Sequence, residues 1–243
     1  LMGMTATGDA FNVFVFLELS SLSTYALIAL GQDRRALTAA FQYLIMGTLG
    51  GTFILISIGF LYAATGTLNM ADLAARLPLA ENQRAVQTAF AFFIVGISLK
   101  LALFPLHLWL PNAYAYAPSV VTIFLAATAT KVAVYVMLRF TFDLFGAHHA
   151  FAGVTLARVF PILAGLGIIL ASLTALYQDH VKRRFAYSSV AQIGYIVLGI
   201  ALMTPSGLTA GLLHIINHAL AKGALFMALG CLYYRLGAMS MSA

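Results

Sequence analysis

The chain has 243 residues, of which 62% are hydrophobic and only 8% are Lys, Arg, Asp or Glu, whereas charged residues make up roughly a quarter of an ordinary globular domain. This composition excludes an ordinary soluble fold, intrinsic disorder, a multi-cysteine disulfide scaffold and a nucleic-acid-binding module with a dense basic surface. The net charge is +6, and at this hydrophobicity such an excess is more typical of orienting membrane loops than of binding phosphate.

Seven apolar stretches are each long enough to cross the membrane, for which a helix needs about 20 residues. They cover residues 10–31, 36–64, 86–109, 118–140, 158–177, 185–203 and 208–234. Because they are about twice as long as the strands of an outer-membrane barrel and do not alternate in polarity, we predict an all-α fold: a polytopic transmembrane helix bundle that forms a single domain over residues 1–243. The interiors of the second, fifth and sixth stretches contain no charged residue or histidine, so we interpret them as packing spans.

The basic loops predict an orientation, because short cytoplasmic loops are enriched in Lys and Arg. Basic residues follow the first, fifth and seventh stretches, at positions 34–35, 182–184 and 235. These three loops fall on the same side if each stretch crosses once. The pattern therefore predicts seven spans with the amino-terminal end outside.

The third stretch departs from a plain helix at Pro105, which is followed by His107 and Pro111. Proline removes a backbone donor and clashes with the preceding turn, so the helix should kink or break there. Irregular backbone at membrane depth occurs only where it is buried in protein or lines a wet cavity. The alternative is a helix that simply ends near Pro105, with Trp109 at the membrane interface. Lys100 lies just before the break, and this charged residue favours a break with a functional role.

Four charged residues lie inside apolar runs, namely Glu18, Lys100, Lys131 and Lys222. At about 3 kcal/mol each, they would cost on the order of 10 kcal/mol if left unpaired. Glu18 has no basic residue nearby in sequence, so its partner must come from another helix, and Lys100 is the leading candidate. A purely structural ion pair is the alternative. Lys131 lies roughly 20 Å along its helix, which is too deep for snorkelling, and should face the interior.

The seventh stretch carries His214, His218 and Lys222 at i, i+4 and i+8. These positions drift by about 40° per step and form one polar stripe. Two histidines at this spacing could instead bind zinc, but the helix supplies no acidic third ligand, so we predict no metal. Histidines can pass protons between lysines at physiological pH.

We therefore predict a lateral proton path at the midplane: Glu18 with Lys100, then Lys131, then His218, His214 and Lys222. Polar side chains that could fill gaps in the path are Ser98, Thr128, Thr130 and Tyr135. No catalytic residue is predicted.

Together these residues resemble the antiporter-like membrane subunits shared by respiratory complex I (NADH:quinone oxidoreductase) and Mrp-type monovalent cation/proton antiporters. The resemblance covers nearly the whole chain, and it rests on the run around Glu18, residues 62–70, Lys100 ahead of residues 104–111, residues 130–132 and the stripe from His214 to Lys222. It implies that Glu18 and Lys100 are the family's buried pair, Lys131 its central relay lysine and the stripe its later relay. The break at Pro105 would be its first discontinuous helix.

Family members have about fourteen helices in two inverted repeats, so the resemblance implies that this chain is a fragment that would not transport alone. Residues 66–73 are most similar to the D subunit of Mrp-type antiporters, with the complex I subunits as the alternative. The implied partners are other integral membrane subunits, protons, and sodium or another monovalent cation. The implied location is the cell inner (plasma) membrane, as a multi-pass protein.

Two other classes of function are possible for such a chain. A membrane metallohydrolase would use His214 and His218, and a passive anchor would need no charge at Glu18 or Lys100. The number and depth of the intramembrane charges favour transport. No cofactor is expected, because the chain has no glycine fingerprint for NADH or flavin and one cysteine cannot hold an iron-sulfur cluster. No nucleic-acid partner is expected either.

Overall fold

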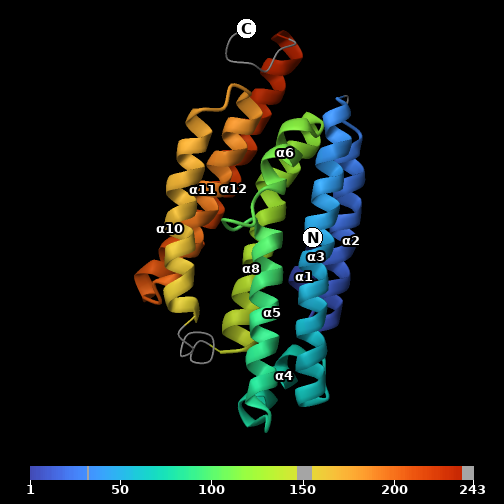
Figure 1. The fold of residues 1–243 in the computed structure, drawn as a ribbon, viewed down its shortest axis with the longest axis vertical. Coiled ribbons are helices and arrows are strands. Elements are labelled where there is room, and N and C mark those ends of the chain that lie inside the picture. The colour runs from blue at the N-terminus through green and yellow to red at the C-terminus, as the bar shows by residue number, and fades with distance from the viewer. Residues whose placement is uncertain (32, 147–154, 237–243) are drawn as a thin grey trace. The chain divides into compact units, whose positions relative to one another are not determined.

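A computed structural model describes residues 1–31, 33–146 and 155–236. The regular elements in these ranges are helices (Figure 1), so the predicted all-α fold is confirmed. The described residues divide into two compact units: those within 1–23, 44–100 and 132–146 form unit 1, and those within 24–43, 101–131 and 155–236 form unit 2. That these form a single domain stays a prediction.

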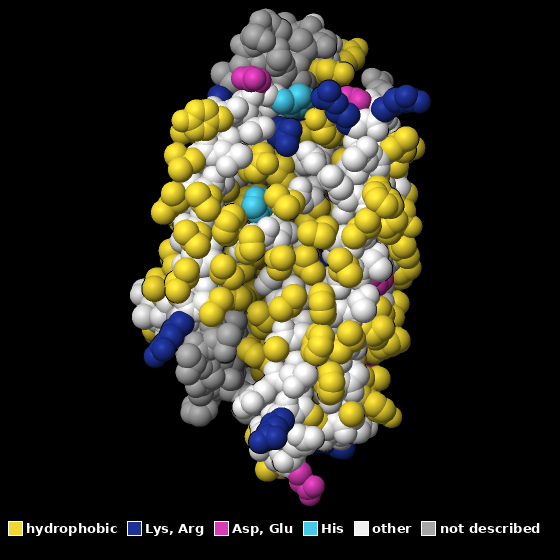
Figure 2. All heavy atoms as spheres, in the orientation of Figure 1, with side chains coloured by type: hydrophobic (Ala, Val, Ile, Leu, Met, Phe, Trp, Pro, Cys, Tyr) yellow, Lys and Arg dark blue, Asp and Glu magenta, His cyan; other side chains and the backbone are white. Residues whose placement is uncertain are grey.

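Six of the described helices are long and apolar enough to cross a membrane. They are Ala10–Ala29, Arg34–Thr65, Gln83–Leu101, Ser119–Leu144, Arg158–Leu176 and Pro205–Arg235. The sixth predicted stretch is also a helix, α11 (Val181–Ala201), but it begins with three basic residues and carries Ser188, Ser189 and Gln192. Much of α11 is buried, so its polar residues meet other helices rather than lipid. On the face drawn in Figure 2, hydrophobic side chains cover the middle of the helices, and most Lys and Arg side chains lie near helix ends.

Unit 1 holds α1 (Met2–Ala6), the first part of α2 (Ala10–Ala29), most of α3 (Arg34–Thr65), α4 (Met70–Arg76), η1 (Leu77–Leu79) and nearly all of α5 (Gln83–Leu101). Most of α8 (Thr130–Leu138) and the π-helical η3 (Arg139–Leu144) complete it. Phe93 of α5 stacks on Phe140 of η3 with ring centroids 4.4 Å apart. Gly50 of α3 meets the backbone of Gly96 in α5, since small residues let helix backbones approach closely.

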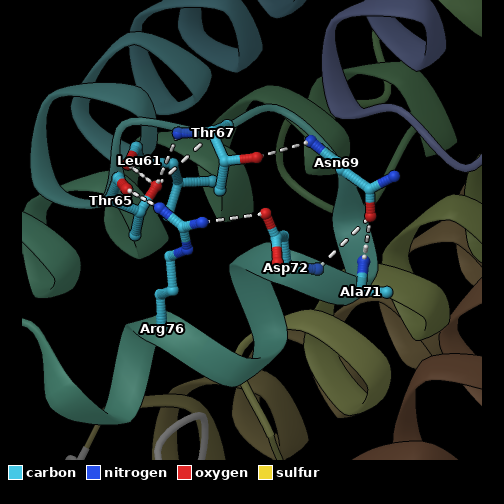
Figure 3. Close-up of polar contacts among 7 residues, drawn as sticks. All are labelled: Leu61, Thr65, Thr67, Asn69, Ala71, Asp72 and Arg76. Atoms are coloured by element: carbon cyan, nitrogen blue, oxygen red, sulfur yellow. Dashed lines mark hydrogen bonds and ion pairs between the residues drawn. The ribbon is translucent and has the colours of Figure 1, made fainter.

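The connection from α3 to α4 is held by a local network of polar contacts (Figure 3). The Asn69 side chain accepts from the backbone N–H groups of Ala71 and Asp72, and so caps α4. Arg76 pairs with Asp72 at 3.1 Å and donates to the carbonyl of Thr65, also at 3.1 Å. Caps of this kind contribute about 1 kcal/mol, and they explain why the run 66–73 forms a defined turn.

Unit 2 contains α6 (Trp109–Tyr116), α7 (Ser119–Phe124), the π-helical η2 (Leu125–Ala129), α10 (Thr155–Leu176), α11 and α12 (Pro205–Leu236). Helix α11 packs between α10 and α12 and also contacts α6, while α12 packs on α7 and η2. Figure 1 shows α10, α11 and α12 side by side. Helix α11 is therefore the centre of this unit.

Two predicted spans differ from the structure in their details. The third ends eight residues early, at Leu101, because the ring of Pro105 would clash with the carbonyl four residues before it. The fourth is a helix interrupted by the π turn η2 and ended by the π turn η3. A π turn inserts one extra residue, which hydropathy does not reveal, and such turns are frequent at functional sites.

Candidate functional site

The predicted ion pair between the first and third stretches is present in unit 1. Nζ of Lys100, in the last turn of α5, donates to Oε1 of Glu18 in α2 at 2.8 Å and to Oγ of Ser21, also at 2.8 Å. The side chain of Lys100 is 7% exposed and that of Glu18 is 24% exposed. The buried ammonium thus has both a counter-charge and a hydroxyl acceptor, as a buried charge requires.

Helix α3 makes room for this ion pair with two glycines. A Cβ atom at Gly51 would overlap the carboxylate of Glu18, and a Cβ at Gly47, one turn earlier, would lie 3.9 Å from Nζ of Lys100. The spacing of these glycines alone indicates only close helix contact. In the structure, the carboxylate of Glu18 lies in the space left by the missing Cβ atom of Gly51.

Lys131 is buried in unit 2, with 8% exposure. It is the second residue of α8, directly after the π turn η2. Its Nζ donates to the carbonyl of Ala126 within that turn and lies 3.4 Å from Oγ1 of Thr130. The lysine therefore points back along its own helix, into the interior, as its depth predicts.

The stripe on α12 lies in the same unit as Lys131. His218 and Lys222 are each 3% exposed, and the rings of His214 and His218 are parallel to within 10°, with centroids 6.1 Å apart. Helix α12 packs on η2, the turn to which Nζ of Lys131 donates, so the stripe and Lys131 belong to neighbouring elements of unit 2. We call Lys131, His214, His218 and Lys222 the lysine–histidine cluster.

Helix α11 supplies partners to the lysine–histidine cluster. Lys222 donates to the carbonyl of Phe185 at 3.0 Å and to Oγ of Ser188. Nε2 of His214 lies 2.6 Å from Oε1 of Gln192. The sequence pattern predicted only a packing role for this stretch and did not reveal Ser188 and Gln192 as partners. Their i, i+4 spacing in a stretch without charged residues is the signal that could have found them.

His218 differs from its neighbours, because neither of its ring nitrogens has a hydrogen-bond partner among the described residues. A buried polar group left in this state costs about 1 to 3 kcal/mol. Buried groups that lack a protein partner usually bind ordered water. The imidazole is therefore placed to accept or donate a further hydrogen bond at either nitrogen.

The helix break at Pro105 is confirmed. Between α5 and α6 the chain makes turns, Ala102 has a left-handed φ of 59°, and the Phe104–Pro105 peptide is cis. His107 is 7% exposed, and its ring lies 5.4 Å from that of Phe104 and 6.2 Å from that of Tyr187 in α11. Its Nδ1 has no partner among the described side chains and backbone.

Not all predicted gap-fillers join the cluster. Thr130 contacts Lys131, but Thr128 donates to the carbonyl of Phe124. Tyr135 is 40% exposed, and its hydroxyl lies 3.5 Å from the carbonyl of Thr5.

Within the described ranges, no three His, Cys, Asp or Glu side chains are close enough to hold a metal ion, so a zinc site would need a ligand from elsewhere.

The comparisons with known proteins agree on one family. The profile described as "NADH:quinone oxidoreductase/Mrp antiporter, TM" matches residues 7–242. The N subunit of the NADH-quinone oxidoreductase of Desulforudis audaxviator is 47% identical over 242 residues, which cover 100% of this chain and 48% of that protein. The D subunit of the Na(+)/H(+) antiporter of Alkalihalophilus pseudofirmus is 33% identical, with coverage of 94% and 45%.

Among solved structures, a chain of the membrane-bound sulfane sulfur reductase, described as an archaeal respiratory membrane complex, matches with a TM-score of 0.88 and 38% identity. The match covers 99% of this chain and 48% of that one. The chain thus spans about half the length of the curated relatives it matches.

Proposed function

The chain belongs to the NADH:quinone oxidoreductase/Mrp antiporter transmembrane family, and on this premise we propose that it is part of a membrane subunit that translocates protons through a path of buried Glu, Lys and His side chains. The proposed order is Glu18 with Lys100, then Lys131, then His218, His214 and Lys222. The proposed path consists of side chains and water and uses no cofactor. Multi-subunit membrane complexes among the relatives support other membrane subunits as partners.

The observation that carries this proposal is the lysine–histidine cluster in unit 2. Titratable groups are costly inside a membrane and usually mark ion pathways or proton relays. Here Lys131, His218 and Lys222 are buried and His214 is half-buried. Hydroxyl, amide and carbonyl groups hold every member of the cluster except His218. A neutral histidine donates from one ring nitrogen and accepts at the other, so His218 can take a proton from one side and release one to the other.

The spacing in the cluster calls for water in the path. The His214 and His218 ring centroids are 6.1 Å apart, which is beyond direct hydrogen bonding but within reach of one bridging water. The two unpartnered nitrogens of His218 are the natural ligands of such waters. In the proposed order, the ion pair of Glu18 and Lys100 is the first step of the path, where a proton would be loaded or released.

Two couplings of proton movement fit this family. Mrp-type exchange of protons for sodium or another monovalent cation is one, supported by the match to the D subunit of an antiporter. Proton pumping within an NADH:quinone oxidoreductase or a related respiratory complex is the other, supported by 47% identity to the N subunit of such an enzyme. A location in the cell inner membrane follows from either.

Reconstitution of the full-length protein in its complex tests the function. Liposomes would contain a pH-sensitive dye and receive either a sodium gradient or the electron donor and acceptor of the complex. We expect a change in lumenal pH that a protonophore abolishes. A response to the sodium gradient supports antiport, and a response to the redox pair supports pumping. A complex that moves no protons under either condition contradicts the proposal.

A further inference from the structure

Unit 2 contains a second polar site, separate from the lysine–histidine cluster. It is a pocket of about 400 Å³ between the end of α2, the start of α3, the end of α6 and the beginning of α11. Its basic lining residues are Arg35, His180 and Lys182, and Tyr233 of α12 also lines it. Figure 2 shows basic, histidine and acidic side chains gathered at one end of the drawn face.

The pocket presents hydrogen-bond donors that are not fully used. Lys182 is 6% exposed, and its Nζ donates to the carbonyl of Ala117 at 3.2 Å. An ammonium has three donors, so others remain for a ligand. Nδ1 of His180 is buried and has no partner among the described atoms. Arg35 is exposed at the rim, with its guanidinium carbon 5.9 Å from the centroid of the Tyr116 ring.

The charge of the pocket is positive. Asp33 is its one acidic lining residue, and its carboxylate accepts from the backbone N–H of Arg35. No ion pair joins Asp33 to a pocket cation within the described residues. Burial and the charges of Lys182 and Arg183 lower the pKa of His180, and Arg35 adds to this effect. An anion in the pocket would offset this repulsion.

The position of the pocket favours a lipid as the source of the anion. The pocket is lined by Arg35 at the start of α3 and by His180 and Lys182 at the start of α11. The sequence predicts that these basic positions lie on the cytoplasmic side, where headgroups meet helix ends. Leu30 and Tyr233 line it and are 70% and 41% exposed. Such an apolar rim suits the glycerol and upper acyl chain of a lipid, whereas a free phosphate would gain nothing from it.

We propose that this pocket binds the phosphate group of an anionic phospholipid, with Lys182 and Arg35 as the charged ligands and His180 as a hydrogen-bond donor. Basic pockets between transmembrane helices on the cytoplasmic side are a recognised setting for anionic headgroups. The basic loops would then bind phosphate as well as orient the spans. This site does not depend on proton transport.

Lipid retention by the purified full-length complex tests the proposal. The complex would be taken from vesicles of phosphatidylglycerol and phosphatidylcholine in equal amounts, and bound lipid would be measured by native mass spectrometry. We expect preferential retention of phosphatidylglycerol, with a loss of about fivefold for Arg35→Gln and again for Lys182→Gln, because each nearby basic residue contributes about 1 kcal/mol. Arg158→Gln makes the same charge change at an exposed position outside the pocket and should retain lipid as the unmodified complex does.

Arg35→Gln keeps the test decisive even where a change at buried Lys182 prevents folding, because Arg35 is exposed. Equal retention of the two lipids, or equal loss in Arg35→Gln and Arg158→Gln, overturns the proposal. Displacement of phosphatidylglycerol by millimolar inorganic phosphate would assign the site to a free anion and overturn the choice of a lipid. Insensitivity to inorganic phosphate supports it.

Discussion

Replacing Lys100 with methionine is expected to lower proton translocation by the full-length complex by about tenfold or more. The substitution leaves Glu18 and Ser21 without the ammonium that both now contact at 2.8 Å. The variant also removes one titratable group of the proposed path, and a barrier raised by about 1.4 kcal/mol is already a factor of ten in a rate. The measurement is dye-reported proton flux, normalised to the amount of assembled complex.

The double variant Glu18→Gln with Lys100→Met separates transport from a purely structural role. It removes both charges, so neither is left uncompensated. If the pair were only structural, assembly and flux should both recover. The proposed function predicts that assembly recovers and flux does not. Full flux in the double variant would contradict a role for the pair in the proton path.

Gly51→Ala tests the same pair without changing a charge. A Cβ there would overlap the carboxylate of Glu18, whereas a Cβ at Gly59, two turns further along α3, meets no atom within 4 Å. Flux should therefore fall in Gly51→Ala and stay unchanged in Gly59→Ala. Equal behaviour of the two variants would show that α3 does not position the carboxylate.

The second large effect is expected at Lys131. Lys131→Met keeps most of the side-chain volume but removes the titratable group, and flux should fall by about a hundredfold, the lower end of what a positioned proton-transfer group contributes. Lys131→Arg keeps the charge but cannot release a proton near neutral pH, so it should not restore flux. Thr128→Val, in the adjacent π turn but bonded to Phe124, is the matched control. Restored flux in Lys131→Arg would show that the position needs only a positive charge.

The sequence was sufficient for features that depend on the cost of charge in an apolar medium. That cost predicted the partnership of Glu18 with Lys100 and the burial of Lys131, and the chemistry of proline predicted the break at Pro105. Each of these features follows from the chemistry of individual residues and of the apolar sequence around them. The roles of these residues in a proton path stay predictions.

The features that the sequence did not predict depend on how the helices pack against one another. Ser188 and Gln192 belong to a stretch with no charge, and only the packing of α11 on α12 turns them toward Lys222 and His214. The π turn before Lys131 adds one residue to the helix and so rotates the side chains that follow it around the helix axis. Hydropathy does not reveal this rotation. The space that Gly51 leaves has meaning only because the carboxylate of Glu18, on another helix, lies there.

The proposed function requires a continuous proton path formed by buried ionisable groups. An experimental density map of the full-length complex, at a resolution that shows ordered water, tests this path. We expect water at both ring nitrogens of His218, in hydrogen-bonded chains that reach Lys131 on one side and His214 or Lys222 on the other. A dry, apolar separation between these side chains would contradict it.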